Sequence, residues 1–422
     1  MAITKKTVKD VDFKGKRVLM RVDFNVPMKD GVVQDDTRIR AALPTINYVL
    51  SQGAKSLVIM SHLGDPDKDI PKAREKAEKD GRPFDEKNFS EGKFKMEPVA
   101  RRFSELLGRE VQFARSCIGQ ETKAMVNALH DGQVLMLENT RLHKGEKSKD
   151  AAARESFAGE LAAYGDIFVN DAFGTAHRAH ASTATVAHFL PAVAGLLMEK
   201  ELEYLDDKVV KGPTKPCVTI LGGAKVSSKI TMIETLLKKV DCLIIGGAMA
   251  NTFLRAKGFE TGKSLVEEDQ LDVARNLLNK AEVNKVSLIL PLDLVVGSEF
   301  SENAETRIVD CDRMPPDMLG MDIGPKTIDA IRKALSTAKT VFWNGPMGVF
   351  EMKKFARGTL EVAEILAHLN GAITVIGGGD TILAVNRAGL ADKMTHISTG
   401  GGASLALVEG KVLPGIAALQ DK

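Results

Sequence analysis

The chain has 422 residues, of which 44% are hydrophobic and 27% charged, and its formal net charge is +2. Such a length predicts roughly two to three domains, and we take two. The near-neutral balance and the 5% of aromatic residues argue against a nucleic acid partner, because both an attracting field and a base-stacking surface are missing. Any affinity for anions must come from local groups of Arg, Lys and His.

Four scattered cysteines and a polar N-terminus bear on the cell compartment. Cys117, Cys217, Cys242 and Cys311 form no CxxC pair, so we expect reduced thiols. Residues 1–12 lack the apolar core of a signal peptide, and no later apolar run is long enough to span a bilayer. We therefore expect a cytoplasmic protein with no membrane partner.

Short β-branched apolar runs alternate with helix-like stretches, a rhythm typical of βαβ units around a buried parallel sheet. This rhythm places the chain in the α/β class. In the first half the apolar runs are Val18–Val22, Ser56–Met60, Val134–Leu137 and Ile167–Val169. The helix-like stretches there include Pro98–Leu107 and Arg154–Tyr164.

The segment Asp65–Lys95 departs from this rhythm. It alternates acidic and basic residues, contains Pro66, Pro71 and Pro83, and has few apolar positions. We expect a solvated surface insertion, partly helical around Lys72–Lys79, and assign it no chemistry.

A longer helix-like run, Leu196–Val210, is expected to connect two sheets, and the alternation resumes beyond it. The second-half apolar runs are Val218–Leu221, Cys242–Ile245, Leu288–Leu290, Thr340–Trp343, Ile373–Ile376 and Thr395–Ser398. The helix-like stretches are Lys225–Lys239, Asp269–Lys280 and Arg357–Leu369.

Cationic and polar residues follow the first-half strands, and ligands of open parallel sheets bind beyond the carboxyl ends of the strands. Any one of the arginines among them, taken alone, is better explained as a surface ion pair with a nearby Asp or Glu. Because Arg forms paired hydrogen bonds with carboxylate or phosphate oxygens, their recurrence predicts a small ligand with several anionic groups. The residues are Asp23, Asn25, Arg38, Arg40, His62, Arg141, His143, Asp171, His177, Arg178 and His180.

Glycine turns follow the second-half strands instead. Glycine lets bare backbone N–H groups approach phosphate oxygens at a helix N-terminus. One such turn is explained by backbone conformation alone, whereas five in one half indicate a phosphate site. The turns are Gly222-Gly223-Ala224-Lys225, Gly246-Gly247-Ala248, Gly345-Pro346-Met347-Gly348, Gly377-Gly378-Gly379-Asp380-Thr381 and Gly400-Gly401-Gly402-Ala403-Ser404.

Several single residues allow two interpretations. Lys225 and Lys229 are expected on one face of a helix, where they reach a phosphate or lie in solvent. Asp380 opens another helix and either holds Mg²⁺ or serves as an N-cap. His177 and His180 lack further ligands at a metal-binding spacing, so we prefer orienting or packing roles to zinc. The sequence has no GxxxxGK[ST], no HRD loop and no GxGxxG with an acidic ribose ligand.

Eight longer strings carry a family resemblance. They are Arg21–Pro27 (RVDFNVP), Ser61–Gly64 (SHLG), Leu137–Arg141 (LENTR), Asn170–Ser182 (NDAFGTAHRAHAS), Leu221–Lys225 (LGGAK), Phe342–Phe350 (FWNGPMGVF), Gly377–Thr381 (GGGDT) and Ser398–Ser404 (STGGGAS). Because they occur in the order of that family, the chain resembles the phosphoglycerate kinases along nearly its whole length.

The resemblance implies two Rossmann-like domains, each a parallel sheet flanked by helices, joined by a hinge helix. Residues 1–195 would bind 3-phosphoglycerate, 196–212 would form the interdomain helix, and 213–404 would bind the nucleotide. The tail 405–422 would pack back on the first domain. We expect a monomer that binds no nucleic acid.

The resemblance also implies reversible phosphoryl transfer between 1,3-bisphosphoglycerate plus ADP and 3-phosphoglycerate plus ATP in glycolysis and gluconeogenesis, with Mg²⁺ bound as MgADP or MgATP. The glycerate ligand would contact Asp23, Asn25, Arg38, His62, Arg141 and Arg178. The nucleotide would contact Lys229, Gly320, Asn344, Pro346, Glu351, Gly378, Gly379, Asp380 and Thr381, with Asp380 on the metal. The migrating group would be surrounded by the catalytic set Arg38, Lys225, Gly379 and Gly402.

Two positions depart from the family pattern. Asp65 stands in SHLGDP where an Arg on the substrate side is usual, and Arg74 or Arg82 of the insertion is a candidate replacement. Ser228 stands where Asp usually precedes the nucleotide-binding Lys.

The expected chemistry needs no general base, because the terminal phosphate of ADP and the glycerate carboxylate are both ionised at neutral pH. Catalysis would rest on in-line positioning and charge neutralisation after hinge closure about 196–210. Two alternatives remain. A nicotinamide-dependent dehydrogenase would carry the dinucleotide fingerprint, and a non-catalytic hinge-bending binding protein would not need two phosphate sites.

Overall fold

The computed structural model describes residues 4–422 and divides them into two compact units. The N-terminal unit comprises residues 4–202 together with Val412–Lys422, and the C-terminal unit comprises Glu203–Lys411. The boundary between the units falls inside the predicted connector 196–212. The C-terminal segment that joins the N-terminal unit begins at Val412, whereas the sequence suggested 405.

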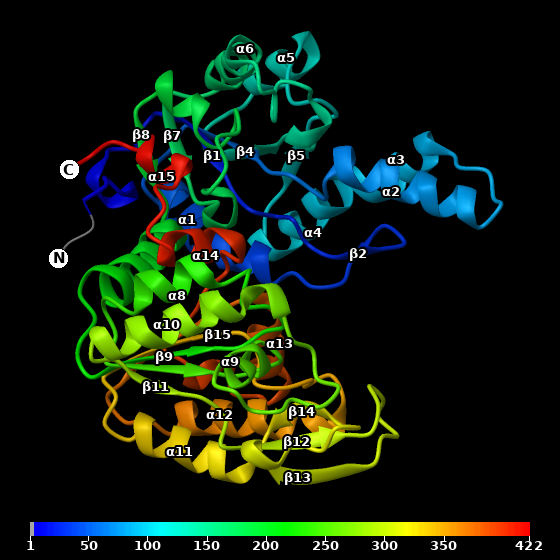
Figure 1. Cartoon of the computed structure of the whole chain (residues 1–422). Helices are drawn as coiled ribbons and strands as arrows, with labels where there is room; N and C mark the ends of the chain where they lie inside the picture. Colours follow the sequence, from blue (N-terminus) through cyan, green and yellow to red (C-terminus); the bar gives the residue numbers. More distant parts are fainter. Residues whose placement is uncertain (1–3) are drawn as a thin grey trace. The chain divides into compact units, whose positions relative to one another are not determined.

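The N-terminal unit is built on a six-stranded parallel sheet (Figure 1). The four apolar runs predicted in this half are strands, each within one residue of its expected bounds. The two edge strands were not predicted. In order across the sheet the strands are β5 (Val111–Phe113), β6 (Gln133–Met136), β4 (Ser56–Met60), β1 (Arg17–Arg21), β7 (Ile167–Asn170) and β8 (Ala192–Ala194).

Helices flank this sheet and enclose an apolar core in which the rings of Phe24 and Phe103 lie 5.2 Å apart. Gly108 ends one predicted helix in the left-handed conformation, with φ of 69°. The larger helices are α1 (Thr37–Ser51), α4 (Glu97–Leu107), α5 (Gln120–Asn127) and α6 (Ala151–Ala162), and a small hairpin pairs β2 (Met28–Lys29) with β3 (Val32–Val33).

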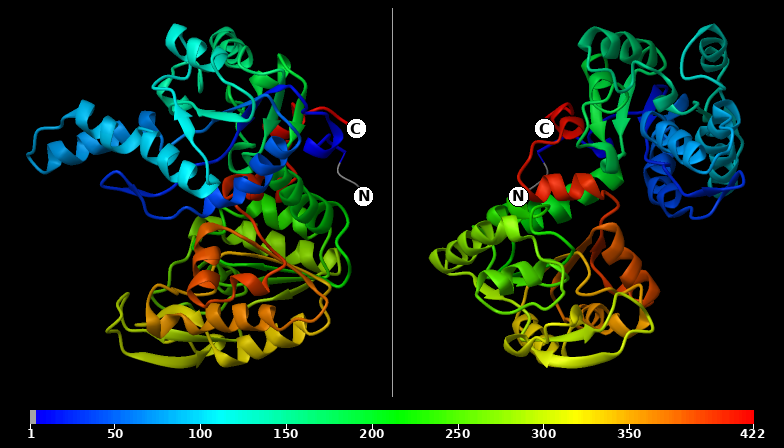
Figure 2. Two further views of the ribbon diagram at one scale, coloured as in Figure 1. Left: turned by 180° about the vertical axis from the view of Figure 1, so that it is seen from behind. Right: turned by 45° about the vertical axis from the view of Figure 1, so that its right-hand side comes forward.

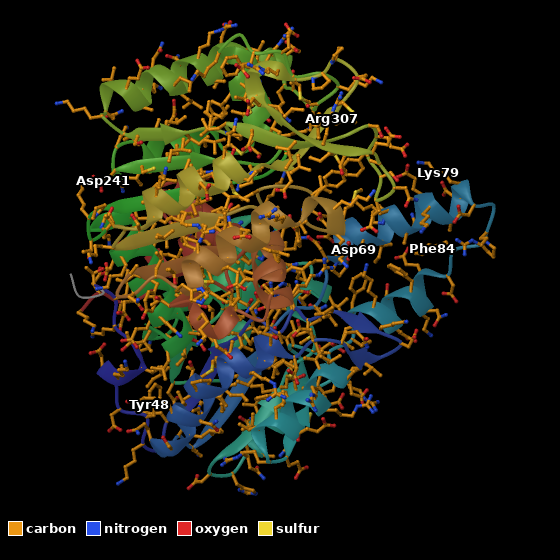
Figure 3. The ribbon with its side chains drawn as sticks, turned by 90° about the horizontal axis from the view of Figure 1, so that it is seen from below. Tyr48, Asp69, Lys79, Phe84, Asp241 and Arg307 are labelled. Carbon is orange, nitrogen blue, oxygen red and sulfur yellow. The ribbon has the colours of Figure 1, made fainter. Side chains whose placement is uncertain are left out.

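The insertion is a helical hairpin, with more helix than the sequence indicated. It consists of α2 (Pro66–Lys79) and α3 (Glu86–Phe94), which pack side by side (Figures 1 and 2). Pro71 lies inside the first of these helices, a position that sequence rules disfavour. The ring of Phe89 lies 5.4 Å from that of Phe84, which Figure 3 labels, and 5.9 Å from that of the buried Phe94. These aromatic contacts stabilise the hairpin although its apolar residues are few.

The C-terminal unit has a second six-stranded parallel sheet with Trp343 fully buried in its core. All six predicted runs are strands, within one residue at each end. In order they are β11 (Ser287–Ile289), β10 (Cys242–Ile245), β9 (Cys217–Leu221), β15 (Thr340–Asn344), β16 (Ile373–Gly377) and β17 (His396–Ile397).

One helix of this unit is shorter than predicted. α8 begins at Ile230, five residues after the expected start at Lys225. The Ser228 hydroxyl donates to the Lys225 carbonyl (2.8 Å), and such local bonds favour a turn over a helix. The helices are α8 (Ile230–Leu236), α9 (Met249–Ala256), α10 (Leu271–Val283), α11 (Pro325–Leu335), α12 (Arg357–Ala367), α13 (Gly379–Arg387) and α14 (Gly402–Val408).

A three-stranded antiparallel sheet was not predicted. Its outer strands are partly exposed and therefore lack the continuous apolar run that marks buried strands. In order the strands are β13 (Thr306–Asp310), β12 (Asp293–Gly297) and β14 (Leu319–Ile323).

The predicted connector is not a single α-helix. It begins as α7 (Leu196–Glu201) and continues as the π-helix η5 (Leu202–Lys211). At the other end of the chain, α15 (Pro414–Ala417) leads to Gln420, whose N–H donates to the Ala192 carbonyl of β8 (3.0 Å) (Figure 1).

All four cysteines are buried and free of disulfides. Among the described residues, no helix is both long and apolar enough to cross a membrane.

Candidate functional site

Adjacent strands bring several predicted anion-binding residues of the N-terminal unit to one edge of the sheet. β6, β4 and β1 are neighbours in the sheet. Arg141 follows β6 in the short helix η2 (Thr140–Leu142), His62 follows β4, and Asp23 follows β1. Because parallel strands end on the same side, these residues gather there.

Direct contacts connect these residues. Arg38, from the first turn of α1, donates from Nη1 to Asp23 Oδ2 (2.9 Å). The Asn25 side-chain oxygen accepts a bond from the Gly64 N–H (2.8 Å), and Arg141 Nη1 donates to the Gly64 carbonyl (2.7 Å). The backbone after β4 thus contacts side chains that follow both neighbouring strands, β1 and β6.

Arg38, Arg141 and Arg178, together with His62, are here called the cationic cluster. The positive charges of its arginines are crowded and partly buried. Burial and the nearby charges of Arg21 and Arg178 lower the pKa of Arg141 to about 10. The buried Nε atom of Arg141 has no hydrogen-bond partner within the described chain. Burial and the charges of Arg21, Arg141 and Arg38 lower the pKa of His62 well below its ordinary value. This surplus of positive charge favours an anionic ligand.

Two further histidines beside the cluster are neutral. Burial and the charge of Arg141 lower the pKa of His180 to about 3, and burial and the charge of Arg178 lower that of His177. Their predicted orienting or packing role stays a prediction. In residues 4–422, no group of three or more His, Cys, Asp or Glu is arranged to hold a metal ion.

Three of the residues predicted to bind an anion have other contacts. Arg40 pairs with Asp36 at 2.7 Å on the surface, and the ring of His143 stacks 3.9 Å from that of Phe157. Asp171 Oδ1 accepts two N–H bonds (3.0 and 3.2 Å) from the start of α7. Burial raises the pKa of Asp171 to about 6. This carboxyl group caps a helix and is separate from the cationic cluster.

Neither arginine proposed from the insertion replaces the charge missing at Asp65. Arg74 and Arg82 both pair with carboxylates inside the insertion. Asp65 pairs instead with Lys147, a residue that sequence reasoning missed. The charge of Lys147 contributes to the lowered pKa of His180, which places this lysine beside the cluster.

Sequence reasoning also missed two fully buried charged residues, Arg21 and Glu146. Arg21 is the last residue of β1, whereas ligand-binding residues were expected only beyond the strand ends. Glu146 lies in the run KGEKSKD, which is typical of a solvated loop. The position of Arg21 inside the string RVDFNVP was the one available signal.

In the C-terminal unit, part of the glycine pattern reflects close packing of the turns. A Cβ atom added at Gly222 would lie 2.0 Å from the Pro346 carbonyl oxygen, and one at Gly345 would lie 2.2 Å from the Gly222 carbonyl oxygen. A Cβ at Gly247, where φ is 66°, would lie 2.6 Å from the Gly223 nitrogen. Only glycine fits these positions.

Gly379 differs from these packed glycines. It begins α13, directly after Gly378 with φ of 89°, and a Cβ added at Gly379 would meet nothing within 4 Å. A ligand can therefore approach the backbone closely here, at a helix N-terminus. Gly402 begins α14 in the same way, after Gly401 with φ of 50°.

A cavity of about 420 Å³ opens beside these turns, with predominantly apolar walls. A nucleoside suits such a site, since pockets for flat organic groups are mostly apolar with a few placed polar groups. The predicted nucleotide-binding residues that line it are Gly320, Pro346, Glu351 and Asp380.

Contacts bring further predicted nucleotide residues together. Lys229 Nζ donates to Asn344 Oδ1, and the Thr381 hydroxyl accepts the Gly345 N–H (2.6 Å). Lys225 is not on a helix with Lys229, contrary to the sequence prediction, because α8 begins after both. The Lys225 side chain is exposed, and its ammonium group makes no hydrogen bond or ion pair with any residue from 4 to 422.

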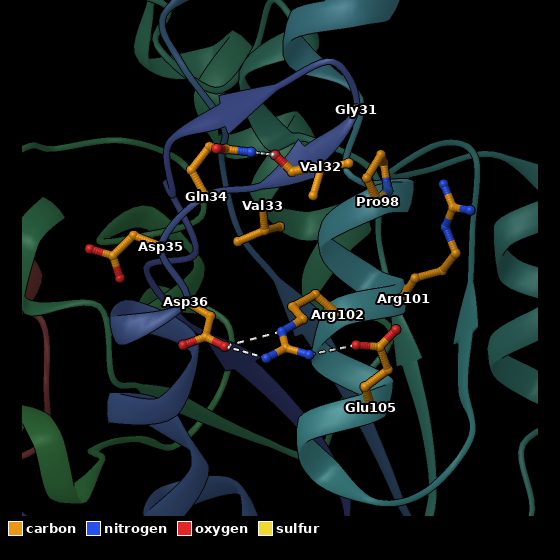
Figure 4. Close-up of a pocket in the computed structure, with 10 residues that line it drawn as sticks. All are labelled: Gly31, Val32, Val33, Gln34, Asp35, Asp36, Pro98, Arg101, Arg102 and Glu105. Atoms are coloured by element: carbon orange, nitrogen blue, oxygen red, sulfur yellow. Dashed lines mark hydrogen bonds and ion pairs between the residues drawn. The ribbon is translucent and has the colours of Figure 1, made fainter.

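A larger, open cavity of about 700 Å³ lies between the β2–β3 hairpin and α4 (Figure 4). Its central cation, Arg102, already donates to Asp36 (2.7 Å) and Glu105 (2.6 Å). Because these carboxylates neutralise that charge, we assign the cavity no function.

A cationic cluster on one α/β unit and a glycine-rich, apolar-walled cavity on the other define a two-domain α/β phosphotransferase. The family model described as phosphoglycerate kinase matches residues 8–411. The phosphoglycerate kinases of Pelotomaculum thermopropionicum and Treponema pallidum are 53% and 52% identical to the chain. The alignments cover 100% of this chain and 100% of the first relative, and 98% of this chain and 99% of the second.

A solved structure of phosphoglycerate kinase from Coxiella burnetii aligns with a TM-score of 0.84 at 39% identity, over 98% of both chains. That from Pyrococcus horikoshii aligns with a TM-score of 0.77 at 34% identity, also over 98% of both chains. The chain belongs to the phosphoglycerate kinase family. It is a phosphotransferase with phosphoglycerate kinase activity, which serves glycolysis and gluconeogenesis.

Proposed function

We propose that the chain transfers a phosphoryl group directly and reversibly between 1,3-bisphosphoglycerate and ADP, with each substrate held on its own unit. The cationic cluster would hold the glycerate ligand through Asp23, Asn25, Arg38, His62, Arg141 and Arg178. The observation that carries this proposal is the crowding of cations around Arg141, whose pKa is lowered by burial and by the charges of Arg21 and Arg178. A small polyanion would neutralise these charges.

The cavity of the C-terminal unit would hold the nucleotide. Gly320, Asn344, Pro346 and Glu351 would face the nucleoside, while Lys229, Gly378, Gly379, Asp380 and Thr381 would lie at the phosphate end. The bond between Lys229 and Asn344 supports this assignment, because it holds an ammonium group at the edge of the glycine turns.

The chemical step needs no proton transfer. A terminal oxygen of ADP attacks the acyl phosphorus, a new P–O bond forms, and the bond to the carboxyl oxygen breaks. The glycerate carboxylate leaves with the electron pair. Charge on the three equatorial oxygens would be neutralised by Arg38, Lys225 and the N–H groups around Gly379 and Gly402.

The donor set of the C-terminal site fits a magnesium ion shared with the nucleotide. Asp380 is exposed in the first turn of α13 and lines the cavity. Magnesium is usually held by one or two carboxylates together with substrate phosphates. Asp380 would hold it there, and the ion would supply positive charge between the phosphates.

The two bound ligands must approach each other, so we propose that the units close when both are occupied. The connector residues 196–212 would accommodate the motion. Small-angle scattering with neither, either and both ligands tests this step. We expect a smaller radius of gyration only with both, and an unchanged radius would contradict closure.

A coupled assay tests the proposed reaction. Purified protein, ADP, Mg²⁺ and 1,3-bisphosphoglycerate should give ATP, and no ATP above the uncatalysed level would contradict the proposal. We further propose a cytoplasmic monomer, which sedimentation velocity would check.

A further inference from the structure

The two fully buried charges beneath the cationic cluster are joined through one serine. Arg21 Nε donates to Ser182 Oγ (2.9 Å), and Ser182 Oγ lies 2.6 Å from Glu146 Oε1. An arginine side chain only donates, and a hydroxyl has one proton, so Ser182 accepts from Arg21 and donates to Glu146. Glu146 also accepts the Ser182 N–H (2.9 Å) and the Thr140 hydroxyl (3.2 Å). These bonds hold Arg21 in one orientation.

The other end of Arg21 reaches His62. Its Nη2 atom lies 3.1 Å from His62 Nδ1. Because the guanidinium group has no acceptor, Nδ1 must present its lone pair, and the proton of the neutral ring must be on Nε2. Asp23 Oδ1 would favour the opposite tautomer, but it lies 3.9 Å from Nδ1, beyond hydrogen-bond distance. The carboxylate of Asp23 is instead bonded to Arg38.

The surroundings of His62 keep its ring neutral. His62 is 2% exposed. Arg21, Arg141 and Arg38 come from three different elements, and their charges act on this ring together with His180. Burial and these cations lower the pKa of His62, so the ring carries one proton near neutral pH. Within residues 4–422, no group accepts a hydrogen bond from Nε2.

We propose that Arg21, held by Ser182 and Glu146, is a positioning residue that keeps the proton of His62 on Nε2. His62 then presents a hydrogen-bond donor to an anionic group of phosphoglycerate. This inference rests on the proposed function, which places the glycerate ligand at His62. In the opposite tautomer a lone pair would face the anion, and the contact would be repulsive. Glu146 balances the buried charge of Arg21 without competing for the ligand, because it is fully enclosed.

Nitrogen-15 NMR of the histidine side chains in the full chain tests the proton position directly. The chain has eight histidines, and the His62 signals are identified by their loss in His62→Gln. We expect a protonated Nε2 and an unprotonated Nδ1 in the wild type at pH 7. A proton on Nδ1, or on both nitrogens, would overturn the inference.

Variants test whether Arg21 sets the tautomer. Arg21→Met removes the donor to Nδ1 and puts no other donor in its place, so we expect a large fraction of His62 to move its proton there. The KM for 3-phosphoglycerate should rise about tenfold, with little change in the KM for ATP. Arg21→Lys keeps a donor and should keep the proton on Nε2. An unchanged tautomer in Arg21→Met would contradict the positioning role.

Ser182→Ala provides a second test that keeps both buried charges. It removes the acceptor of Arg21 Nε, so we expect a partial shift of the His62 proton and a smaller rise in the same KM. If Arg21→Met does not fold, as judged by its thermal unfolding, a wild-type tautomer in Ser182→Ala would overturn the role of the network.

Substitutions of His62 separate this inference from the proposed function. His62→Gln retains an N–H donor near the Nε2 position and should bind 3-phosphoglycerate better than His62→Ala, whose KM should rise about tenfold or more. An unchanged KM in His62→Ala would contradict the placement of the substrate. The wrong tautomer in the wild type would contradict only the proton placement.

Discussion

The proposed anion sites of the two units are built from different chemical groups. In the N-terminal unit the site consists of long charged side chains, several of them buried and bonded to one another, as Arg38 is to Asp23. In the C-terminal unit the site consists of glycine backbone, such as Gly379, beside an apolar cavity. The first site should therefore be sensitive to loss of charge, and the second to added volume.

The largest effect should come from removing the charge of Arg38. Arg38→Ala should lower kcat by about 10²–10³-fold, the range for losing one donor to transition-state charge, with little change in nucleotide affinity. Lys225→Ala should act in the same way. Arg40→Ala is a matched control two residues away, because Arg40 pairs on the surface. Near-normal turnover of Arg38→Ala in a steady-state assay would remove Arg38 from the catalytic set.

The next effect concerns stability in acid. The pKa of His180 is lowered to about 3, below its ordinary 6.5, so from pH 6.5 down to 3 the unfolded chain binds a proton that the folded chain does not. This contribution is complete above pH 6.5 and is lost as the pH falls. By pH 5 the free energy of unfolding has lost about 2 kcal/mol of this contribution.

His180→Gln should therefore lose less stability than the wild type between pH 7 and pH 5, as measured by urea unfolding. The exposed His130→Gln serves as the control. An equal loss in His180→Gln and the wild type would show that the pKa of His180 is not lowered in the folded chain.

A smaller effect is expected from added volume at the nucleotide site. Gly379→Ala introduces a methyl group that meets no protein atom within 4 Å and should leave the melting temperature unchanged. It should still raise the KM for ADP about tenfold, or about 1.4 kcal/mol, by obstructing phosphate approach to the helix N-terminus. Gly92→Ala, equally open but in α3, is the control. Normal KM in Gly379→Ala would argue that no phosphate contacts this backbone.

The smallest effect should be a shift in metal requirement. Asp380→Asn removes one negative ligand and should raise the Mg²⁺ concentration for half-maximal activity severalfold. An unaltered requirement, measured by titrating Mg²⁺ at fixed ADP, would assign Asp380 to capping α13.

The two sites also differed in how far sequence could predict them. Periodicity located ten strands of the two parallel sheets because each is a short apolar run and most are buried, and strand ends then predicted Asp23, His62 and Arg141. The partly exposed strands of the antiparallel sheet carried no such run. Arg21 and Glu146 were missed because burial of a charge depends on partners distant in sequence, such as Ser182. The strings that resemble phosphoglycerate kinases supplied the residue roles, which spacing alone left open.

Isothermal titration calorimetry tests most directly whether glycerate and nucleotide occupy separate units. 3-Phosphoglycerate is titrated into the wild type and Arg38→Ala, each alone and with saturating MgADP. We predict that MgADP leaves the glycerate site available, and that Arg38→Ala weakens glycerate binding while MgADP still binds. Competition between the two ligands for one site would contradict the assignment of one substrate to each unit.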